Sequence, residues 1–346
     1  MKRFLCLAAF LALLVLGGCS DADNSSADSD AANQSEPIRL TYANFPPAFT
    51  VPCVQMERWK TEVEKRSNGQ VLVETFPGGT LLKAKNMLRG VVEGQADIGC
   101  VGMSYLPGVF PACSAVELPL GFESSRSSSR TLWALFDKYR PEELQDVKVL
   151  TMFATPPSNI MSREPIRGLA DLQGKEMRGS GSSSRFLDAM GAVSVSMPMP
   201  EVPDALQKNM VQGIFTSLEV LQDMKFAEFC PSATIVDGPV YLFAVVMNKD
   251  RWDALPPATQ QMLDELAPDQ ADWTGQYWDA HTAEAMEWAR AEHGLQVFAL
   301  SEEDRATASA QAADMFTDWT QAASKAGLPA EDILQDVRAW KQQFEQ

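Results

Sequence analysis

The sequence predicts an α/β fold of mostly parallel sheets that is divided into two lobes. Segments typical of strands alternate with segments typical of helices, which is the pattern of parallel sheets joined by crossover helices. The stretch from Ile38 to Gln346 has ordinary globular composition and is longer than the chain that one hydrophobic core usually serves. The last part, from Pro256 to Gln346, is almost entirely helical in pattern.

The predicted strands are short apolar or alternating segments at 38–43, 71–76, 147–153, 193–196 and 240–247. Helical segments fall between most of them. Met56, Trp59 and Val63 recur at helical spacing ahead of Gly69, and an apolar stretch at 87–92 precedes another glycine. A glycine just past a helical pattern indicates the C-terminal end of a helix.

The C-terminal part interrupts its helical pattern once. A short strand is expected at 295–299, between two helical stretches. Ser301 followed by Asp304 forms a pattern in which a serine side chain accepts a hydrogen bond at a helix N-terminus. We therefore expect a new helix to begin next to Ser301.

The first residues have the pattern of a bacterial export signal with a lipidation site. Lys2 and Arg3 precede an apolar run at 4–16 that is too short to span a membrane, and Leu-Gly-Gly leads into Cys19. We expect residues 1–18 to be removed and the Cys19 thiol to be acylated. The alternative is an ordinary signal peptide with a chance cysteine. Residues 19–37 are mostly small and polar, which indicates a disordered acidic tether, so the folded part is expected in the periplasm, anchored to a membrane by lipid.

The chain is strongly acidic, with a formal net charge of -17. Removal of Lys2 and Arg3 with the signal leaves -19 on the mature chain. Such a charge argues against a nucleic-acid partner, because nucleic acids bind proteins largely through their phosphates. If the ligand is an anion, a local cation must overcome the repulsion from the rest of the protein.

The cysteines and histidines do not form the pattern of a metal or haem site. The body keeps Cys53, Cys100, Cys113 and Cys230, without a Cys-x-x-Cys pair, and the two histidines lie on one predicted helix. We expect no metal and no other cofactor. Four cysteines in an oxidising compartment leave two interpretations open, at least one disulfide or four buried free thiols.

Motifs of hydrolases and nucleotide-binding proteins are missing from the sequence. There is no Gly-x-Ser-x-Gly, no His-Glu-x-x-His and no phosphate-binding loop. With 46 Asp and Glu residues, no pair of carboxylates stands out as catalytic. The sequence therefore predicts a protein that is not an enzyme.

Loops after the predicted strands, where open α/β sheets place their ligands, carry aromatic, hydroxyl and glycine residues at 44–47, 99–105, 153–159 and 178–184. The last of these loops begins with Arg178 and continues as glycine and serine. A guanidinium beside free backbone N–H groups is a good receptor for a carboxylate or sulfonate, because it offers planar paired donors. The alternative is a surface arginine in a flexible loop.

Six segments in this order resemble the substrate-binding proteins of TRAP transporters, the DctP family. They lie at 59–69, 76–81 (Phe-Pro-Gly-Gly-Thr-Leu), 90–99, 117–120 (Glu-Leu-Pro-Leu), 172–178 and 200–207. The resemblance covers the body from about Ile38 to the final helices. It implies two α/β lobes around a ligand cleft, a long helix that spans both, and closure of the lobes over the ligand.

The resemblance also implies lobe boundaries, partners and an anchor residue. Lobe 1 is expected at 38–154 plus about 245–283, and lobe 2 at 155–244 plus about 284–346. The partners implied are the small and large membrane subunits of a TRAP permease, powered by an ion gradient. Arg178 occupies the position of the arginine that pairs with the ligand carboxylate in this family.

Departures from the family pattern bear on the ligand. The usual Glu-Asn-Pro is replaced by Phe215, Thr216 and Ser217, and a second arginine of some members corresponds to Ser158. A small organic monoanion, a carboxylate with an aromatic or apolar body, is therefore expected, with a small sulfonate as the alternative. Rival functions of other classes are a ligand sensor for a receptor and an exported hydrolase.

The remaining candidate ligand contacts are polar, aromatic or sulfur-containing side chains in the predicted loops. Polar groups that would orient the ligand are Asn44, Asn159, Ser180 and Thr216. Aromatic candidates in or near cleft-facing segments are Phe45, Phe49, Tyr105, Phe153, Phe215, Tyr241 and Phe243, and Met103 completes the set.

Overall fold

The computed structural model describes residues 36–346, of which Pro37–Gln346 form one compact unit. The predicted signal at 1–18, the lipidation site Cys19 and all but the end of the predicted tether lie outside the described residues. Within the described chain, none of the helices has the length and apolar character that crossing a membrane requires.

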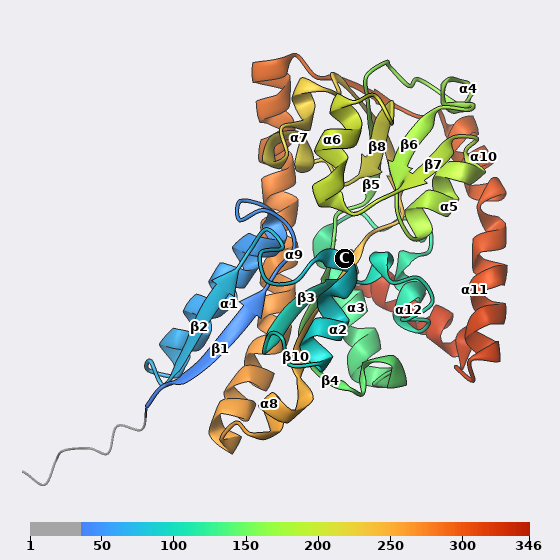
Figure 1. The fold of residues 1–346 in the computed structure, drawn as a ribbon. Coiled ribbons are helices and arrows are strands. Elements are labelled where there is room, and N and C mark those ends of the chain that lie inside the picture. Colours follow the sequence, from blue (N-terminus) through green and yellow to red (C-terminus); the bar gives the residue numbers. More distant parts are fainter. Residues whose placement is uncertain (1–35) are drawn as a thin grey trace, which may run out of the picture. The chain divides into compact units, whose positions relative to one another are not determined.

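Two sheets organise the fold (Figure 1). The first has the strand order β2-β1-β3-β10-β4 and the second has the order β11-β9-β5-β8-β6-β7. The strands of the first sheet are β1 (Ile38–Ala43), β2 (Val71–Phe76), β3 (Ile98–Gly102), β4 (Val147–Ala154) and β10 (Leu242–Asn248). Those of the second are β5 (Ser158–Ser162), β6 (Glu176–Gly179), β7 (Val193–Ser196), β8 (Gly213–Thr216), β9 (Ser232–Gly238) and β11 (Gln296–Ala299).

Helices cover the sheets and fill most connections between strands. They are α1 (Val51–Arg66), α2 (Met87–Val92), α3 (Ser125–Tyr139), α4 (Leu169–Leu172), α5 (Ser182–Ala189), α6 (Val202–Gln207), α7 (Val220–Asp223), α8 (Lys249–Asp253), α9 (Pro257–His293), α10 (Glu302–Gln311), α11 (Ala313–Lys325) and α12 (Ala330–Phe344). The predicted α/β class is confirmed. The expected cap is also present, because the Ser301 side chain accepts from the Asp304 N–H at the start of α10.

The prediction of mostly parallel sheets is confirmed by a narrow margin. Of the nine strand pairs in residues 36–346, five are parallel and four are antiparallel. The antiparallel pairs all involve β10 or β5, which lie inside the first and second sheet. The chain enters each of these strands directly from the other sheet, without a helical crossover. Both strands are therefore antiparallel to their neighbours in the sheet.

The chain passes between the sheets by two short segments that lie side by side. One joins β4 to β5 through 155–157, and the other joins β9 to β10 through 239–241. The Thr155 N–H donates to the Tyr241 carbonyl at 2.9 Å, and the Tyr241 N–H donates to Thr155 Oγ1 at 3.0 Å. These hydrogen bonds hold the two crossover segments together where the sheets meet.

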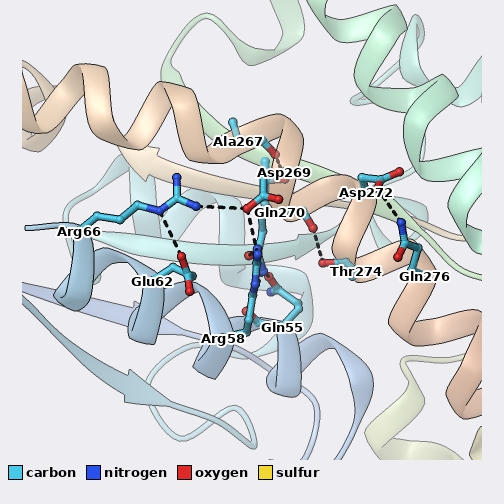
Figure 2. A network of polar contacts seen from close by, with 11 residues as sticks. Gln55, Arg58, Glu62, Arg66, Ala267, Asp269, Gln270, Asp272, Thr274 and Gln276 are labelled. Carbon is cyan, nitrogen blue, oxygen red and sulfur yellow. Dashed lines mark hydrogen bonds and ion pairs between the residues drawn. The ribbon is translucent and has the colours of Figure 1, made fainter.

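The long helix α9 packs against β4 of the first sheet and against three helices, α1, α3 and α7. The helices α1 and α3 connect or precede strands of the first sheet, whereas α7 follows β8 of the second. Figure 2 shows the polar contacts that fix its first half to α1. Arg58 donates to Asp269 at 2.9 Å and also to Gln270, and the Gln270 amide donates to the Gln55 carbonyl at 2.9 Å. Because Gln270 is buried, its paired amide specifies how α1 and α9 dock.

Candidate ligand-binding site

A pocket of about 590 Å³, part of which is open solvent, lies between the two sheets. Its walls come from loops after β1 and β3, from the crossover segments, from β6 and β8, and from α7 and α9. The lining includes Phe45, Ser104, Tyr105, Thr155, Arg178, Met199, Thr216, Ser217, Glu219, Asp223, Tyr241, Phe243 and Trp278. The size and mixed lining are typical of sites for small molecules.

Arg178 is the cation of this pocket. It lies on β6, between β7 and β8, and its side chain is 0% exposed. Its Nε and Nη2 donate to the Met197 carbonyl at 3.1 and 2.8 Å, and Nη2 also donates to Ser180 Oγ at 3.1 Å. All of these acceptors are neutral, and no ion pair joins Arg178 to a carboxylate within the described chain.

A buried guanidinium without a counterion is energetically costly, because burial removes its hydration and nothing of opposite charge replaces it. The side chain is nevertheless held in place from one side, since its hydrogen bonds to Met197 and Ser180 leave the Nη1 edge with only a 3.5 Å contact to the Tyr241 hydroxyl. The arrangement presents a fixed positive charge that an anionic group entering the pocket can neutralise.

Two tyrosine hydroxyls accompany the guanidinium. The Tyr105 hydroxyl accepts from the Met199 N–H at 3.2 Å and lies 3.5 Å from Arg178 Nη2, so its own proton is left for another acceptor. The Tyr241 hydroxyl donates to the Phe215 carbonyl at 3.0 Å, so its oxygen can only accept. Burial raises the pKa of Tyr105 although Arg178 lowers it, and the hydroxyl therefore stays protonated at neutral pH.

Aromatic rings form the apolar wall. Phe45 contacts Tyr105 edge to face, with ring centroids 5.5 Å apart. Phe243 stacks between Phe45 and Phe153, and its centroid is 5.9 Å from that of Trp278. These contacts fix the rings of the wall against one another, so a planar or apolar ligand body meets a preformed surface.

The second charged part of the pocket is acidic. Glu219, directly before α7, and Asp223, at the end of α7, both line the pocket. Glu219 accepts from Ser217 Oγ at 2.9 Å, and Asp223 Oδ1 lies 2.7 Å from His281 Nε2. Glu219 Oε2, Asp223 Oδ2 and Trp278 Nε1 are buried without a hydrogen-bond partner. Burial, and then repulsion from Asp223, raise the pKa of Glu219 to about 7.

Some of the predicted ligand contacts line the pocket, and others lie outside its lining. Arg178, Thr216, Phe45 and Tyr105 line the pocket, as do Tyr241 and Phe243. Ser180 contacts Arg178 and does not line the pocket itself, and Met103 lines a neighbouring cavity. Phe153 lies behind Phe243, and Phe49 is exposed.

The other predicted residues support backbone or core. Asn44 donates to the Pro52 carbonyl at 2.7 Å and accepts from the Phe45 N–H at 3.0 Å. Asn159 Oδ1 accepts from the Val236 N–H at 2.7 Å. Phe215 stacks on Phe186 on the other face of β8. These contacts leave them outside the pocket lining.

Sequence reasoning missed Glu219, Asp223 and Trp278. The available signal was position, because Glu219 and Asp223 follow the end of β8 at a spacing of four residues, next to Thr216. That signal was hidden because acidic residues are abundant throughout this sequence.

The four body cysteines are free and buried, which is the second of the two interpretations left open. Burial raises the pKa of the Cys53 and Cys230 thiols to about 12, so neither is a reactive thiolate at neutral pH. In the described part of the chain, no group of three or more His, Cys, Asp or Glu side chains is arranged to hold a metal ion.

Comparisons with known proteins identify the family. The model of the DctP family, described as "Bacterial extracellular solute-binding protein, family 7", matches residues 45–322. A TRAP periplasmic solute-binding protein from Desulfovibrio salexigens is 49% identical, with a TM-score of 0.82, over 89% of this chain and 97% of that one. Its structure is described as an open complex with the C-terminus of a symmetry mate in the ligand-binding site.

Two further proteins are more distant. A marine metagenome TRAP solute-binding protein specific for aromatic acid ligands, in complex with 3-hydroxybenzoate, is 28% identical with a TM-score of 0.85, over 90% of this chain and all of that one. The 2,3-diketo-L-gulonate-binding periplasmic protein of Escherichia coli is 25% identical over 61% of this chain and 66% of that protein.

The chain therefore belongs to the bacterial extracellular solute-binding proteins of family 7, the TRAP periplasmic solute-binding proteins of the DctP type. This confirms the resemblance seen in the sequence, and the likeness to the solved structures confirms the two-lobed fold. Members of this family are transport proteins and not enzymes. The exact lobe boundaries stay a prediction.

Proposed function

We propose that this protein captures a small organic acid with a single carboxylate and delivers it to the membrane subunits of a TRAP permease. The observation that carries the proposal is Arg178, a fully buried guanidinium on the pocket wall with only neutral acceptors around it. A ligand carboxylate would supply the missing negative charge and form paired hydrogen bonds with it.

The surroundings of Arg178 favour a carboxylate with an aromatic or apolar body. Phe45, Phe243 and Trp278 offer a preformed apolar wall. The Tyr105 hydroxyl proton is free to donate to a further acceptor on the ligand. The Thr216 and Ser217 hydroxyls in the lining keep a small sulfonate as the second candidate, since a tetrahedral group has more oxygens to bond. The 3-hydroxybenzoate complex of a relative and the C-terminus bound in another support the carboxylate.

Ligand capture would proceed by closure of the two lobes around the crossover segments. Thr155 and Tyr241, which hydrogen-bond to each other in these segments, also line the pocket. Closure would exclude water and strengthen the charge-assisted bonds to Arg178. We place lobe 1 at 38–154 plus about 245–283 and lobe 2 at 155–244 plus about 284–346, with α9 belonging to both.

The location follows from the family and from the N-terminus. The family is extracytoplasmic, and we propose that acylation of Cys19 holds this member to a membrane by a tether. The small and large permease subunits would then receive the ligand from the closed form at the membrane surface.

The test is a calorimetric titration of the purified protein with aromatic and aliphatic monocarboxylates, sulfonates of matched shape and the corresponding amides. Binding of a monocarboxylate, recovered chemically unchanged, supports the proposal. Tighter binding of the matched sulfonate would show that the ligand is a sulfonate and not a carboxylate. A ligand that is hydrolysed, or a chain that binds a chemoreceptor or kinase domain and no permease, would point to the rival functions instead.

A further inference from the structure

The acidic part of the pocket has no role in binding a carboxylate, and its chemistry is complementary to a cation. Glu219 is 4% exposed, and the Asp223 side chain is 6% exposed. Glu219 Oε2 and Asp223 Oδ2 both lack a hydrogen-bond partner, although the two residues line the pocket. Buried polar atoms without partners are rare in folded proteins, because the lost hydration is not replaced.

The charges on this side do not cancel. Asp223 pairs with His281, and this hydrogen bond raises the pKa of His281, which favours the imidazolium and a neutral pair. Glu284, also on α9, lies 3.9 Å from His281 Nδ1, but its side chain is 77% exposed. Tyr277 and Glu219 are further titratable neighbours of Asp223. Glu219 bonds the Ser217 hydroxyl and its own N–H and lies near the Trp278 indole N–H. His281 is close enough to interact electrostatically with Glu219 as well as Asp223, so two carboxylates share one cation and one negative charge remains uncompensated.

Glu219 and Arg178 do not serve as each other's counterion. Arg178 bonds Met197 and Ser180 at the β6 side, whereas Glu219 bonds Ser217 and lies next to Trp278 of α9. The two groups share no hydrogen-bond partner among residues 36–346. One pocket therefore contains a buried cation and a buried acid at separate places.

We propose, on the basis of the proposed function, that the ligand is zwitterionic: its carboxylate binds Arg178, and a protonated amine at its other end binds Glu219 and Asp223. The ammonium donates to the two unpartnered carboxylate oxygens, and it has three donors for them. Trp278, which lines the pocket beside Glu219, adds an aromatic ring that favours a nearby cation. A hydroxyl group would satisfy one oxygen and leave the charge of Glu219 without a partner.

The probes are matched sets of three carboxylates that differ only at the end distant from the carboxylate. One set is 3-(aminomethyl)benzoate, 3-(hydroxymethyl)benzoate and 3-ethylbenzoate, and another is 5-aminopentanoate, 5-hydroxypentanoate and hexanoate. Each compound is titrated calorimetrically into the wild-type protein at pH 8, where the amines are still protonated. We expect the amine of at least one set to bind at least tenfold more tightly than its two counterparts.

Glu219→Gln keeps the shape of the side chain and removes its charge. The preference for the amine should fall by tenfold or more in this variant, while the affinity for the uncharged counterparts stays within threefold. Glu284→Gln is the matched control, because it removes a carboxylate near His281 that does not line the pocket, and it should keep the preference.

Equal or tighter binding of the hydroxyl or methyl compounds in every set, or an amine preference that survives Glu219→Gln, would overturn the zwitterion inference. Loss of binding in an Arg178 variant would in that case leave the proposed function intact. Failure of all carboxylates to bind the folded wild-type protein would overturn both.

Discussion

Replacement of Arg178 by methionine removes the positive charge and keeps a side chain of similar length. A ligand carboxylate would lose two charge-assisted hydrogen bonds, each worth roughly 1.5–3 kcal/mol. A total of about 3–6 kcal/mol corresponds to a loss of affinity of roughly 10² to 10⁴-fold. The variant is therefore expected to show no binding at ligand concentrations that saturate the wild type.

The stability of the unliganded variant should change little. Arg178→Met gives up three hydrogen bonds, two to the Met197 carbonyl and one to Ser180. Each is worth about 1 kcal/mol net, and their loss is offset because the variant no longer buries a charge without a counterion. The melting temperature of the unliganded protein should therefore stay within a few degrees of the wild-type value.

Isothermal titration with the tightest carboxylate measures the first effect, and a thermal melt measures the second. Arg185→Met is the control, because this substitution removes the same charge outside the pocket. Arg185 lies on α5, is half exposed and pairs with Asp318. Its affinity should equal that of the wild type. An Arg178→Met affinity within threefold of wild type would refute the assignment of Arg178 as the carboxylate partner.

Three further predictions concern stability and anchoring. Burial raises the pKa of Glu117, which bonds Ser104 and Ser182, from its ordinary 4.5 to about 7. As pH rises from 4.5 to 7, the free energy of unfolding of the wild type, measured in urea, should therefore fall by up to roughly 3 kcal/mol more than that of Glu117→Gln. Glu219, whose pKa is also raised to about 7, contributes equally to both proteins. Parallel pH curves would contradict this. Gly213→Ala places a Cβ 2.4 Å from the Met161 carbonyl, so it should lower the free energy of unfolding by about 3 kcal/mol in the same assay. A decrease under about 0.5 kcal/mol would count against this steric argument. Cys19→Ser should release the protein from membranes and remove the acyl mass in mass spectrometry, and an unchanged membrane fraction would argue against lipidation.

Features with local signals could be predicted from the sequence. The strands at 38–43, 71–76 and 193–196 have the predicted bounds, because their apolar residues are flanked by turn or helix signals. Helix α1 ends at Arg66, and Asn68 and Gly69 follow with positive φ angles of 50° and 76°. The pairing of β5 and β10 was not predictable in the same way, because strand direction depends on how distant segments meet.

Within the candidate site, the sequence pointed to the residue whose type and neighbours are unusual, and it did not distinguish residues of common types. The loop alone left a surface arginine open as the alternative, and Arg178 stood out because it also occupies the position of the family's carboxylate-binding arginine. The structure buries it at the pocket. Asn44 and Asn159 have the same donors and acceptors as a ligand-binding amide, but they satisfy backbone groups of their own loops and strands. Glu219 differs from the many surface acids only by its burial, which is a tertiary property.

The most direct test of the account is a thermal-shift screen of the wild-type protein against monocarboxylates, each paired with its primary amide. A ligand that binds only the folded state contributes about 2.7 kcal/mol at 100 times its Kd, which raises the melting temperature of a body of this size by roughly 4 °C. We predict such a shift for at least one acid and none for its amide. Equal shifts for acid and amide, or no shift with any acid in folded, ligand-free protein, would contradict the buried guanidinium as a carboxylate receptor.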